Sequence, residues 1–405
     1  MKSEKEYVPS KKILDKYADV LIRFGLNDGK GIKKGDVVFL QVPECAKPML
    51  SALSNSVLRA GGNPIIQYIP DGISKDFFNL AGDNQLNFFP GKYLRGRIDE
   101  IDHSVSIEAE ENPHELEKVD PKKIMQRSKS FRLYKEWRDE KENRKKFSWT
   151  LALYGTEAMA KEAGMTLKEY WGEIINACYL NDKNPVKKWG EIVKEINRVK
   201  DRLNNLKVRK LHVEAMGTDL IVGLDGNRKW LGGDGANIPS FEVFISPKSE
   251  ETEGRIRFTE KLYRYGNLIE GVELEFKKGK VVKASAKKGE KVLKEMIATD
   301  SGSCKIGEFS LTDKRLSKIN RFMATTLFDE NVGGRYGNIH LALGNAYQSS
   351  YPGNVSKVSK GEWKKMQYNE SVVHTDIVST ADKKVTAILE NGEEKVIYMD
   401  GKFLI

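Results

Sequence analysis

The chain has 405 residues, 39% hydrophobic and 31% charged, with a formal net charge of +10, which indicates a globular chain long enough for two or three domains. No apolar run approaches the roughly 18 residues that span a bilayer, and no apolar segment follows the basic N-terminus, so neither a transmembrane helix nor a secretory signal peptide is predicted. Three scattered cysteines fit no disulfide or zinc-finger pattern and the lysines are interleaved with acids, which predicts a cytoplasmic protein that binds neither membranes nor nucleic acid.

The first half of the chain alternates helical and strand patterns. Apolar residues at helical spacing predict a helix over residues 12–26. Strand patterns over residues 37–43 and 64–70 flank a helical pattern over residues 47–62, and the three together predict a βαβ unit with parallel strands. No G-x-G-x-x-G follows the first strand, so no dinucleotide site is predicted.

The remainder of this half continues in the same way. The charge run K-E-W-R-D-E-K-E-N-R-K-K over residues 135–146 is typical of a solvated, ion-paired helix face. A strand pattern over residues 149–155 leads into a helical stretch over residues 156–180, and a charged helix over residues 189–206 forms the bridge to the second half. We therefore predict an N-terminal α/β domain with parallel strands over residues 1–206.

Short alternating strand patterns begin after Lys207. Clusters of Gly, Asp and Asn separate them, and the pair Lys278-Gly279 marks the turn of a hairpin. These patterns predict a β-rich, largely antiparallel α+β domain at the C-terminus, over residues 207–405. The strand patterns are K-L-H-V-E-A-M, D-L-I-V-G-L, R-K-W-L-G-G, F-E-V-F-I-S-P, V-E-L-E-F and V-V-K-A-S-A.

The five histidines of the chain fall into two groups. His103, His114 and His212 lie among charged or turn residues, which is typical of structural or solvent-exposed side chains. His340 and His374 lie in apolar stretches beside a carboxylate or small residues. These last two are therefore the candidates for chemistry.

Two segments place these histidines beside other candidate ligands. V-V-H-T-D-I-V predicts a strand, in which His374 and Asp376 share a face about 7 Å apart along the strand. Such a pair suits metal binding, although a histidine satisfied by its neighbouring aspartate is an equally good interpretation of these two residues alone. If I-H-L-A-L-G-N-A-Y is extended, small residues on the face of His340 leave room for an ion. Tyr347 then either assists as a weak ligand or oxyanion donor, or is a core tyrosine.

Two glutamates in apolar surroundings complete the set of candidates. Glu242 lies between aromatic residues in N-I-P-S-F-E-V-F, and Glu308 lies in I-G-E-F-S-L. A carboxylate in such surroundings is costly unless it is paired or coordinated. Each alone could be a salt-bridged structural acid, but together with the histidines they favour a metal site.

These motifs resemble those of the M29 family of metallopeptidases, the thermophilic aminopeptidase type. The resemblance is carried in order by N-I-P-S-F-E-V-F, I-G-E-F-S-L, F-D-E-N, H-L-A-L-G-N-A-Y and N-E-S-V-V-H-T-D. It covers roughly residues 207–400, whereas the first half resembles the family only in its general α/β character.

The resemblance implies the chemistry of the site. It makes Glu242, Glu308, His340, His374 and Asp376 ligands of two divalent ions (zinc, cobalt or manganese). It also implies that Tyr347 lies at or near the metals, and that the protein is a homodimer acting on peptides with a free N-terminus.

A two-metal mechanism follows from this implied set. Two ions about 3.5 to 4 Å apart make a hydroxide available near neutral pH for attack on the scissile carbonyl. We expect Glu308 to bridge the ions because a G-E-F turn places it between two sites, and Tyr347 to stabilise the oxyanion. Glu330 and Asp234 are candidates for orienting ligands, shuttling protons or binding the substrate amine, or are ordinary surface or cap acids.

Two rival functions and one departure from the family stay open. A dinuclear phosphoesterase would need a phosphate-binding patch, and a non-catalytic binding protein would carry no stoichiometric ions. Between F-D-E-N and His340 the chain inserts V-G-G-R-Y-G-N-I, a glycine-rich extension at Gly333–Asn338. We expect Arg335 and Tyr336 on this extension to affect the choice of substrate.

Overall fold

The computed structural model describes residues 7–405, and its N-terminal part is built on a parallel sheet. The strand order is β2-β1-β3-β4-β7, and every neighbouring pair is parallel. Its last strand comes from the second half of the chain, so that half completes the sheet. The strands are β1 (Val37–Pro43), β2 (Asn63–Ile69), β3 (His103–Glu108), β4 (Ser148–Leu153) and β7 (Asn237–Ile238).

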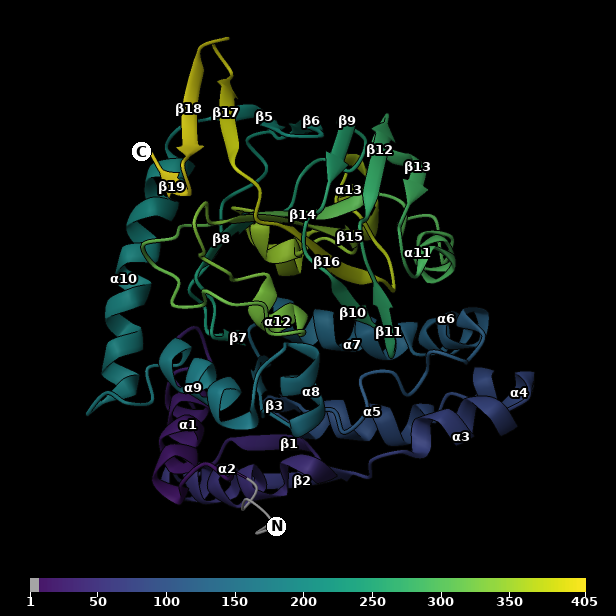
Figure 1. The fold of residues 1–405 in the computed structure, drawn as a ribbon, viewed down its shortest axis with the longest axis vertical. Helices are drawn as coiled ribbons and strands as arrows, with labels where there is room; N and C mark the ends of the chain where they lie inside the picture. The colour runs from purple at the N-terminus through teal and green to yellow at the C-terminus, as the bar shows by residue number, and fades with distance from the viewer. Residues whose placement is uncertain (1–6) are drawn as a thin grey trace.

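Helices connect and cover these strands. Several begin at a side chain that accepts a hydrogen bond from the first turn, such as Ser10 before α1 and Thr166 before α9. The longest, α10, runs along one side of the molecule from the N-terminal part to the C-terminal part (Figure 1). The helices are α1 (Lys11–Arg23), α2 (Lys47–Arg59), α3 (Ile73–Leu80), α4 (Asp83–Asn87), α5 (Gly91–Glu100), α6 (Pro121–Ser130), α7 (Arg132–Asn143), α8 (Glu157–Glu162), α9 (Leu167–Ala177) and α10 (Pro185–Asn204).

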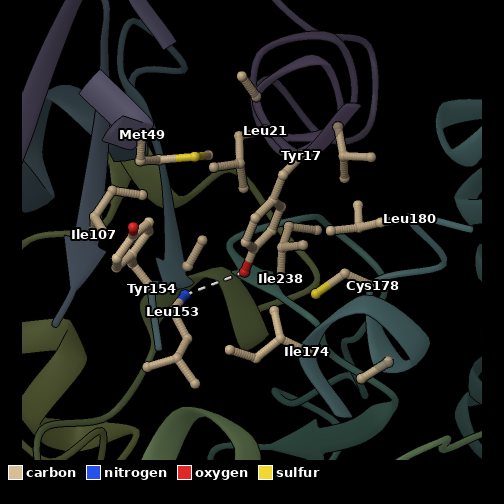
Figure 2. Close-up of a cluster of buried hydrophobic side chains, with 14 of the residues drawn as sticks. Tyr17, Leu21, Met49, Ile107, Leu153, Tyr154, Ile174, Cys178, Leu180 and Ile238 are labelled. Atoms are coloured by element: carbon tan, nitrogen blue, oxygen red, sulfur yellow. Dashed lines mark hydrogen bonds between the residues drawn. The ribbon is translucent and has the colours of Figure 1, made fainter. Parts of the chain in front are cut away.

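The core of the N-terminal part closes around Tyr17. This side chain is 1% exposed, and its hydroxyl accepts a hydrogen bond from the Leu153 N–H at 3.2 Å (Figure 2). Residues from the second half join the same core, because Trp189 stacks on Phe241 with ring centroids 5.5 Å apart. The two parts of the chain are thus packed together directly before Glu242.

Antiparallel sheets form the C-terminal part. One has eight strands in the order β13-β12-β9-β6-β5-β17-β18-β19, and the other has four in the order β16-β15-β14-β8. A short hairpin and three helices complete it. The elements are β5 (Val208–Ala215), β6 (Thr218–Gly223), β8 (Glu242–Ile245), β9 (Thr252–Arg257), β10 (Leu262–Arg264), β11 (Asn267–Ile269), β12 (Glu273–Lys277), β13 (Lys280–Ser285), α11 (Glu290–Ile297), β14 (Ile306–Thr312), α12 (Thr326–Asp329), β15 (Asn338–Gly344), α13 (Lys360–Lys365), β16 (His374–Ser379), β17 (Lys383–Leu389), β18 (Glu394–Met399) and β19 (Lys402–Phe403).

The predicted fold class is confirmed, with two corrections at the level of elements. Strand β3 was not predicted, because only Val105 and Ile107 of its sequence H-S-V-S-I-E are apolar and acidic residues flank this short stretch. The run R-K-W-L-G-G is not a strand and forms only an isolated bridge from Leu231 to Phe244. The hairpin turn is confirmed, with φ of 49° at Lys278 and 75° at Gly279.

The division predicted after residue 206 falls in the link between α10 and β5 and stays a prediction. Within residues 7–405, no helix is long and apolar enough to cross a membrane.

Candidate metal centre

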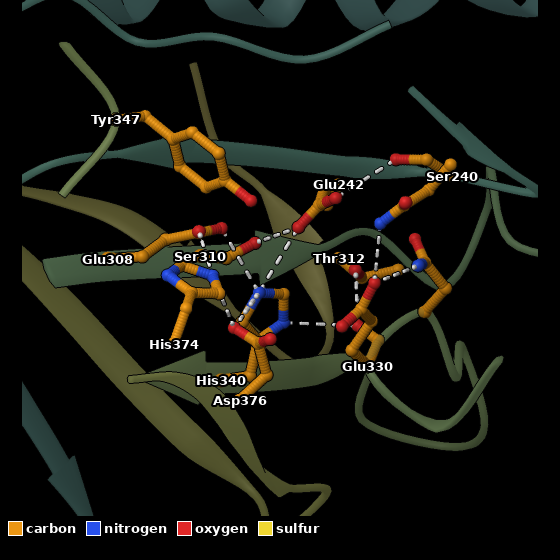
Figure 3. Close-up of polar contacts among 12 residues, drawn as sticks. Ser240, Glu242, Glu308, Ser310, Thr312, Glu330, His340, Tyr347, His374 and Asp376 are labelled. Atoms are coloured by element: carbon orange, nitrogen blue, oxygen red, sulfur yellow. Dashed lines mark hydrogen bonds and ion pairs between the residues drawn. The ribbon is translucent and has the colours of Figure 1, made fainter. Parts of the chain in front are cut away.

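The four-stranded sheet brings the five predicted ligands onto one face (Figure 3). Glu242 comes from β8, Glu308 from β14 and His340 from β15, while β16 supplies both His374 and Asp376. The last two share a face because strand side chains alternate, as predicted. Four neighbouring strands therefore converge on one cluster.

His340 lies at the centre of this cluster and is 1% exposed. Its Nε2 is 3.2 Å from Glu242 Oε2, 3.3 Å from Glu308 Oε1 and 3.9 Å from Asp376 Oδ1. Three carboxylates thus surround one imidazole nitrogen.

His374 makes a second such centre beside the first. Its Nε2 is 3.4 Å from Glu308 Oε2 and 3.6 Å from Asp376 Oδ1. The two oxygens of Glu308 consequently face different histidines. Serine hydroxyls hold the remaining glutamate, since Ser240 and Ser310 donate to Glu242 at 3.1 and 3.0 Å.

Main-chain carbonyls fix the tautomers of both histidines. The Nδ1 of His340 donates to the Glu330 carbonyl at 3.2 Å, and that of His374 donates to the Asn345 carbonyl at 2.9 Å. With Nδ1 occupied in this way, Nε2 of each ring is directed at the carboxylates. Metal-ligating histidines are oriented by the same kind of second hydrogen bond.

The carboxylates and histidines perturb each other strongly. Burial alone would lower the pKa of His340, but hydrogen bonds to Glu242 and Glu308 raise it well above its usual range. Burial would raise the pKa of Glu308, yet hydrogen bonds from His340 and His374 lower it to about 2. Burial and the neighbouring charges of Asp376 and Glu242 raise the pKa of Glu330. The cluster thus favours bound positive charge.

This donor set fits divalent cations. Three groups of ligand atoms lie within 4.8 Å of one another, and Glu308 belongs to two of them. Asp376 Oδ1 is buried with no hydrogen-bond partner among the described residues, as expected of an atom that coordinates a cation. Imidazole and carboxylate ligands together suit zinc, cobalt or manganese. The groups are Glu242, Glu308 and His340; Glu308, His374 and Asp376; and Glu330, His340 and Asp376.

The local position of Glu308 differs from the prediction. It lies within strand β14 rather than in a turn, next to a register shift between Ile306 and Glu308. Gly307 makes this irregularity possible, because a Cβ there would lie 2.1 Å from the carbonyl oxygen of Asn345. The bulge, not a turn, aims Glu308 between the two histidines.

Tyr347 lies beside the cluster as predicted. Its ring contacts His374 edge-on, with centroids 5.0 Å apart, and also contacts Phe244 at 5.6 Å. Its hydroxyl is directed toward Glu242 and Glu308 (Figure 3). Burial, followed by the charges of Glu308 and Asp376, raises the pKa of its phenol well above the usual range.

The cluster faces a cavity of about 60 Å³, which adjoins a cleft of about 2120 Å³. Residues that line both include Tyr347, His374, Asp234, Glu142 and Trp149. The last two come from α7 and β4 in the N-terminal part. Glu142 corrects our interpretation of residues 135–146 as a wholly solvated face, and no motif in the sequence could have assigned it to the site.

Comparison with known proteins identifies the family. The model of the Thermophilic metalloprotease (M29) family matches residues 10–403. The chain belongs to the M29 family. The match covers the first half as well, for which the motifs had shown only α/β character.

Relatives of this M29 chain are similar over their whole length. Aminopeptidase AmpS of Bacillus subtilis is 28% identical over 96% of this chain and 98% of its own length. Aminopeptidase T of Thermus thermophilus is 28% identical over 98% of this chain and 99% of its own length. The solved structure of wild-type AmpT from Thermus thermophilus matches with a TM-score of 0.81 and 26% identity, covering 98% of this chain and 100% of that one. The prediction of a metal-dependent peptide-bond hydrolase is confirmed.

Of the other candidate residues in the M29 chain, two line the cavity beside the metal centre and two do not. Glu330 and Asp234 both line the small cavity, and Asn237 donates to Glu330 Oε1 at 2.9 Å. Arg335 and Tyr336 line neither the cavity nor the cleft. Their extension is instead held by Lys383, whose Nζ donates to the Tyr336 carbonyl at 2.9 Å.

The three remaining histidines of the M29 chain lie outside the metal centre, each beside a carboxylate. His103 is buried in β3 and contacts Asp36 at 2.9 Å. His114 lies 3.1 Å from Glu162, and His212 lies 2.8 Å from Asp219.

Proposed function

We propose that this M29 chain is an aminopeptidase that works with two divalent ions. The observation that carries the proposal is the position of Glu308, whose two oxygens face His340 and His374 separately. A carboxylate shared in this way is suited to bridging two ions. The proposed ligands are Glu242, Glu308, His340, His374 and Asp376, with Tyr347 as an adjacent group.

The residues around the ligands supply the rest of the chemistry. When bound, two divalent ions lower the pKa of water and polarise a carbonyl group. Tyr347 is the donor suited to a developing oxyanion, because its hydroxyl is directed toward the proposed ligands Glu242 and Glu308. Glu330 orients His340 through its main-chain carbonyl.

The substrate is a peptide with a free N-terminus. The relatives named above are aminopeptidases, and the ligands line a small cavity of about 60 Å³ beside the cleft. The adjoining cleft of about 2120 Å³ accommodates the remainder of the substrate.

The alternative function, a phosphoesterase, is disfavoured by the charges of the side chains that line the small cavity. Among the described residues, no lysine or arginine lines the small cavity, whereas Glu142, Asp234 and Glu330 line it together with the ligands. Within residues 7–405, the small cavity therefore offers no permanently cationic side chain to a phosphate group. A binding protein without catalysis does not require so complete a ligand set.

The test is release of amino acids from a panel of short peptides. Activity should disappear with a chelator and return with zinc, cobalt or manganese, and the protein should bind about two ions per chain. Glu308→Ala should lose activity and bound metal, whereas Glu275→Ala, which alters an exposed glutamate on β12, should change neither. No release from any free-N-terminus peptide by protein carrying two ions would refute the peptidase.

We further propose that the enzyme is a cytoplasmic homodimer with its ligands in a C-terminal catalytic domain, residues 207–405. The three cysteines are free. Edge strand β2 exposes Ile65, Ile66 and Ile69, with exposed fractions of 38%, 49% and 37%, and such an edge favours a partner. A monomeric mass by light scattering at micromolar concentration would exclude the dimer.

A further inference from the structure

Two acidic side chains line the small cavity without belonging to the metal cluster. Glu142 projects from α7, and Asp234 lies in the loop before β7. Neither belongs to a group of potential ligand atoms within 4.8 Å of one another. They are therefore not candidates for the metal ligands.

No cation in the protein neutralises this pair directly. Among residues 7–405, neither carboxylate forms an ion pair within 4.0 Å. Trp149 Nε1 donates to Glu142 Oε1 at 3.3 Å, and Asp234 Oδ1 accepts from the Ala236 N–H at 2.9 Å. Both side chains are thus held in place by neutral donors, and their charge stays uncompensated.

The pKa values of the two acids also indicate a site for a cation. Burial raises the pKa of Glu142 to about 7, with Arg138 opposing this and Asp139 and Asp234 adding to it. Burial also raises the pKa of Asp234, and the charges of Glu242 and Asp28 add to this. Other acids contribute to the raised pKa of each carboxyl. A cation bound between the two carboxylates is therefore stabilised.

We propose that Glu142 and Asp234 form the subsite for the protonated α-amino group of the substrate. This inference rests on the proposed function, since the amino group lies two bonds from the scissile carbonyl and must bind next to the metals. Both acids also line the cleft of about 2120 Å³, from which the end of a peptide can reach them beside the ligands.

The proposal assigns a role to the N-terminal part of the chain. The C-terminal sheet supplies the metal ligands, whereas α7 supplies the acid that distinguishes a chain end from a chain interior. Glu142 and Asp234 are then specificity-determining residues, since a peptide without an N-terminal charge would leave both carboxylates unpaired.

The experiment compares two inhibitors that differ only in the amino group. Leucine hydroxamate and 4-methylpentanoyl hydroxamate are both hydroxamates suited to binding the metals, and only the first carries an α-amine. Their dissociation constants are measured by calorimetry on metal-loaded wild type, Glu142→Gln, Asp234→Asn and Glu140→Gln. Glu140 is the control, because it is exposed on α7 and paired with Arg144.

We expect Glu142→Gln and Asp234→Asn each to weaken leucine hydroxamate about 10- to 100-fold, the range for losing a hydrogen bond to a charged group. Binding of 4-methylpentanoyl hydroxamate, the metal content and both constants of Glu140→Gln should stay within about twofold of wild type.

Three results would overturn the inference. They are equal weakening of both inhibitors, loss of metal from either variant, and no change in either affinity. If wild-type protein carrying two ions binds neither inhibitor and cleaves no peptide, the proposed function itself fails. That outcome is distinct, because it is visible without any variant.

Discussion

The uncompensated charge of Glu142 predicts that Glu142→Gln stabilises the protein at alkaline pH. Burial of this side chain raises the pKa of its carboxyl from 4.5 to about 7. The folded chain therefore holds a proton that the unfolded chain has released between these two pH values. Stability falls as pH rises through this window, and the cost is fully present above about pH 7.

The size of the effect follows from the two pKa values. Each pH unit between them corresponds to 1.36 kcal/mol, so the upper limit is about 3 kcal/mol. The side chain is only half-buried, and solvent screening lowers the expected value to about 1–2 kcal/mol. For a chain of this length that corresponds to a rise of roughly 2 °C in Tm.

Urea unfolding of chelated wild type and Glu142→Gln, at pH 5 and at pH 8, measures this difference. The variant should be more stable at pH 8 and about equal to wild type at pH 5. Glu140→Gln, on the same helix but exposed, should differ from wild type by the same amount at both values. A variant that is destabilised at pH 8, or equally stabilised at both, would show that Glu142 is not an uncompensated buried charge.

Three further predictions concern other parts of the molecule. Trp189→Ala should cost about 3–5 kcal/mol in urea unfolding, because Trp189 is 1% exposed and stacked between Phe24 and Phe241. Burial lowers the pKa of Lys383 to about 7, so stability linked to this group rises with pH above that value. Lys383→Met should therefore destabilise more at pH 9 than at pH 6, and an equal loss at both would contradict this. Burial, followed by Asp71, raises the pKa of Cys45 to about 12, so mass spectrometry should show slow labelling of Cys45 by iodoacetamide at pH 8.

Sequence patterns predicted the elements whose burial is regular. Strand β1 was predicted over residues 37–43, which are the residues observed, because its apolar run is bounded by clear turn signals. Strand β3 was missed because polar residues, His103 and Ser104, occupy buried positions in it. The spacing of apolar residues indicates which positions of a strand are buried. A central strand with polar residues at buried positions therefore lacks this signal.

The metal ligands were accessible to sequence reasoning because each one stands out locally. His374 and Asp376 share a face by alternation alone, and Glu242 and Glu308 are carboxylates within apolar strands. The order of the strands was not accessible, and neither was the bulge that directs Glu308 between the two histidines. Local rules thus select the ligand types, while the pairing of distant strands sets their geometry.

The position of Glu142 beside the metal centre could not be predicted from local sequence patterns. It lies in one of the most charged segments of the chain, and nothing within that segment separates it from Glu140, which is exposed. The difference arises only when α7 packs beside the loop that follows β15, where Asn143 donates to Gln348. A role in recognising the substrate amine would therefore be set by the docking of the two halves. Substitutions that loosen this docking should reduce discrimination against blocked peptides before they reduce metal binding.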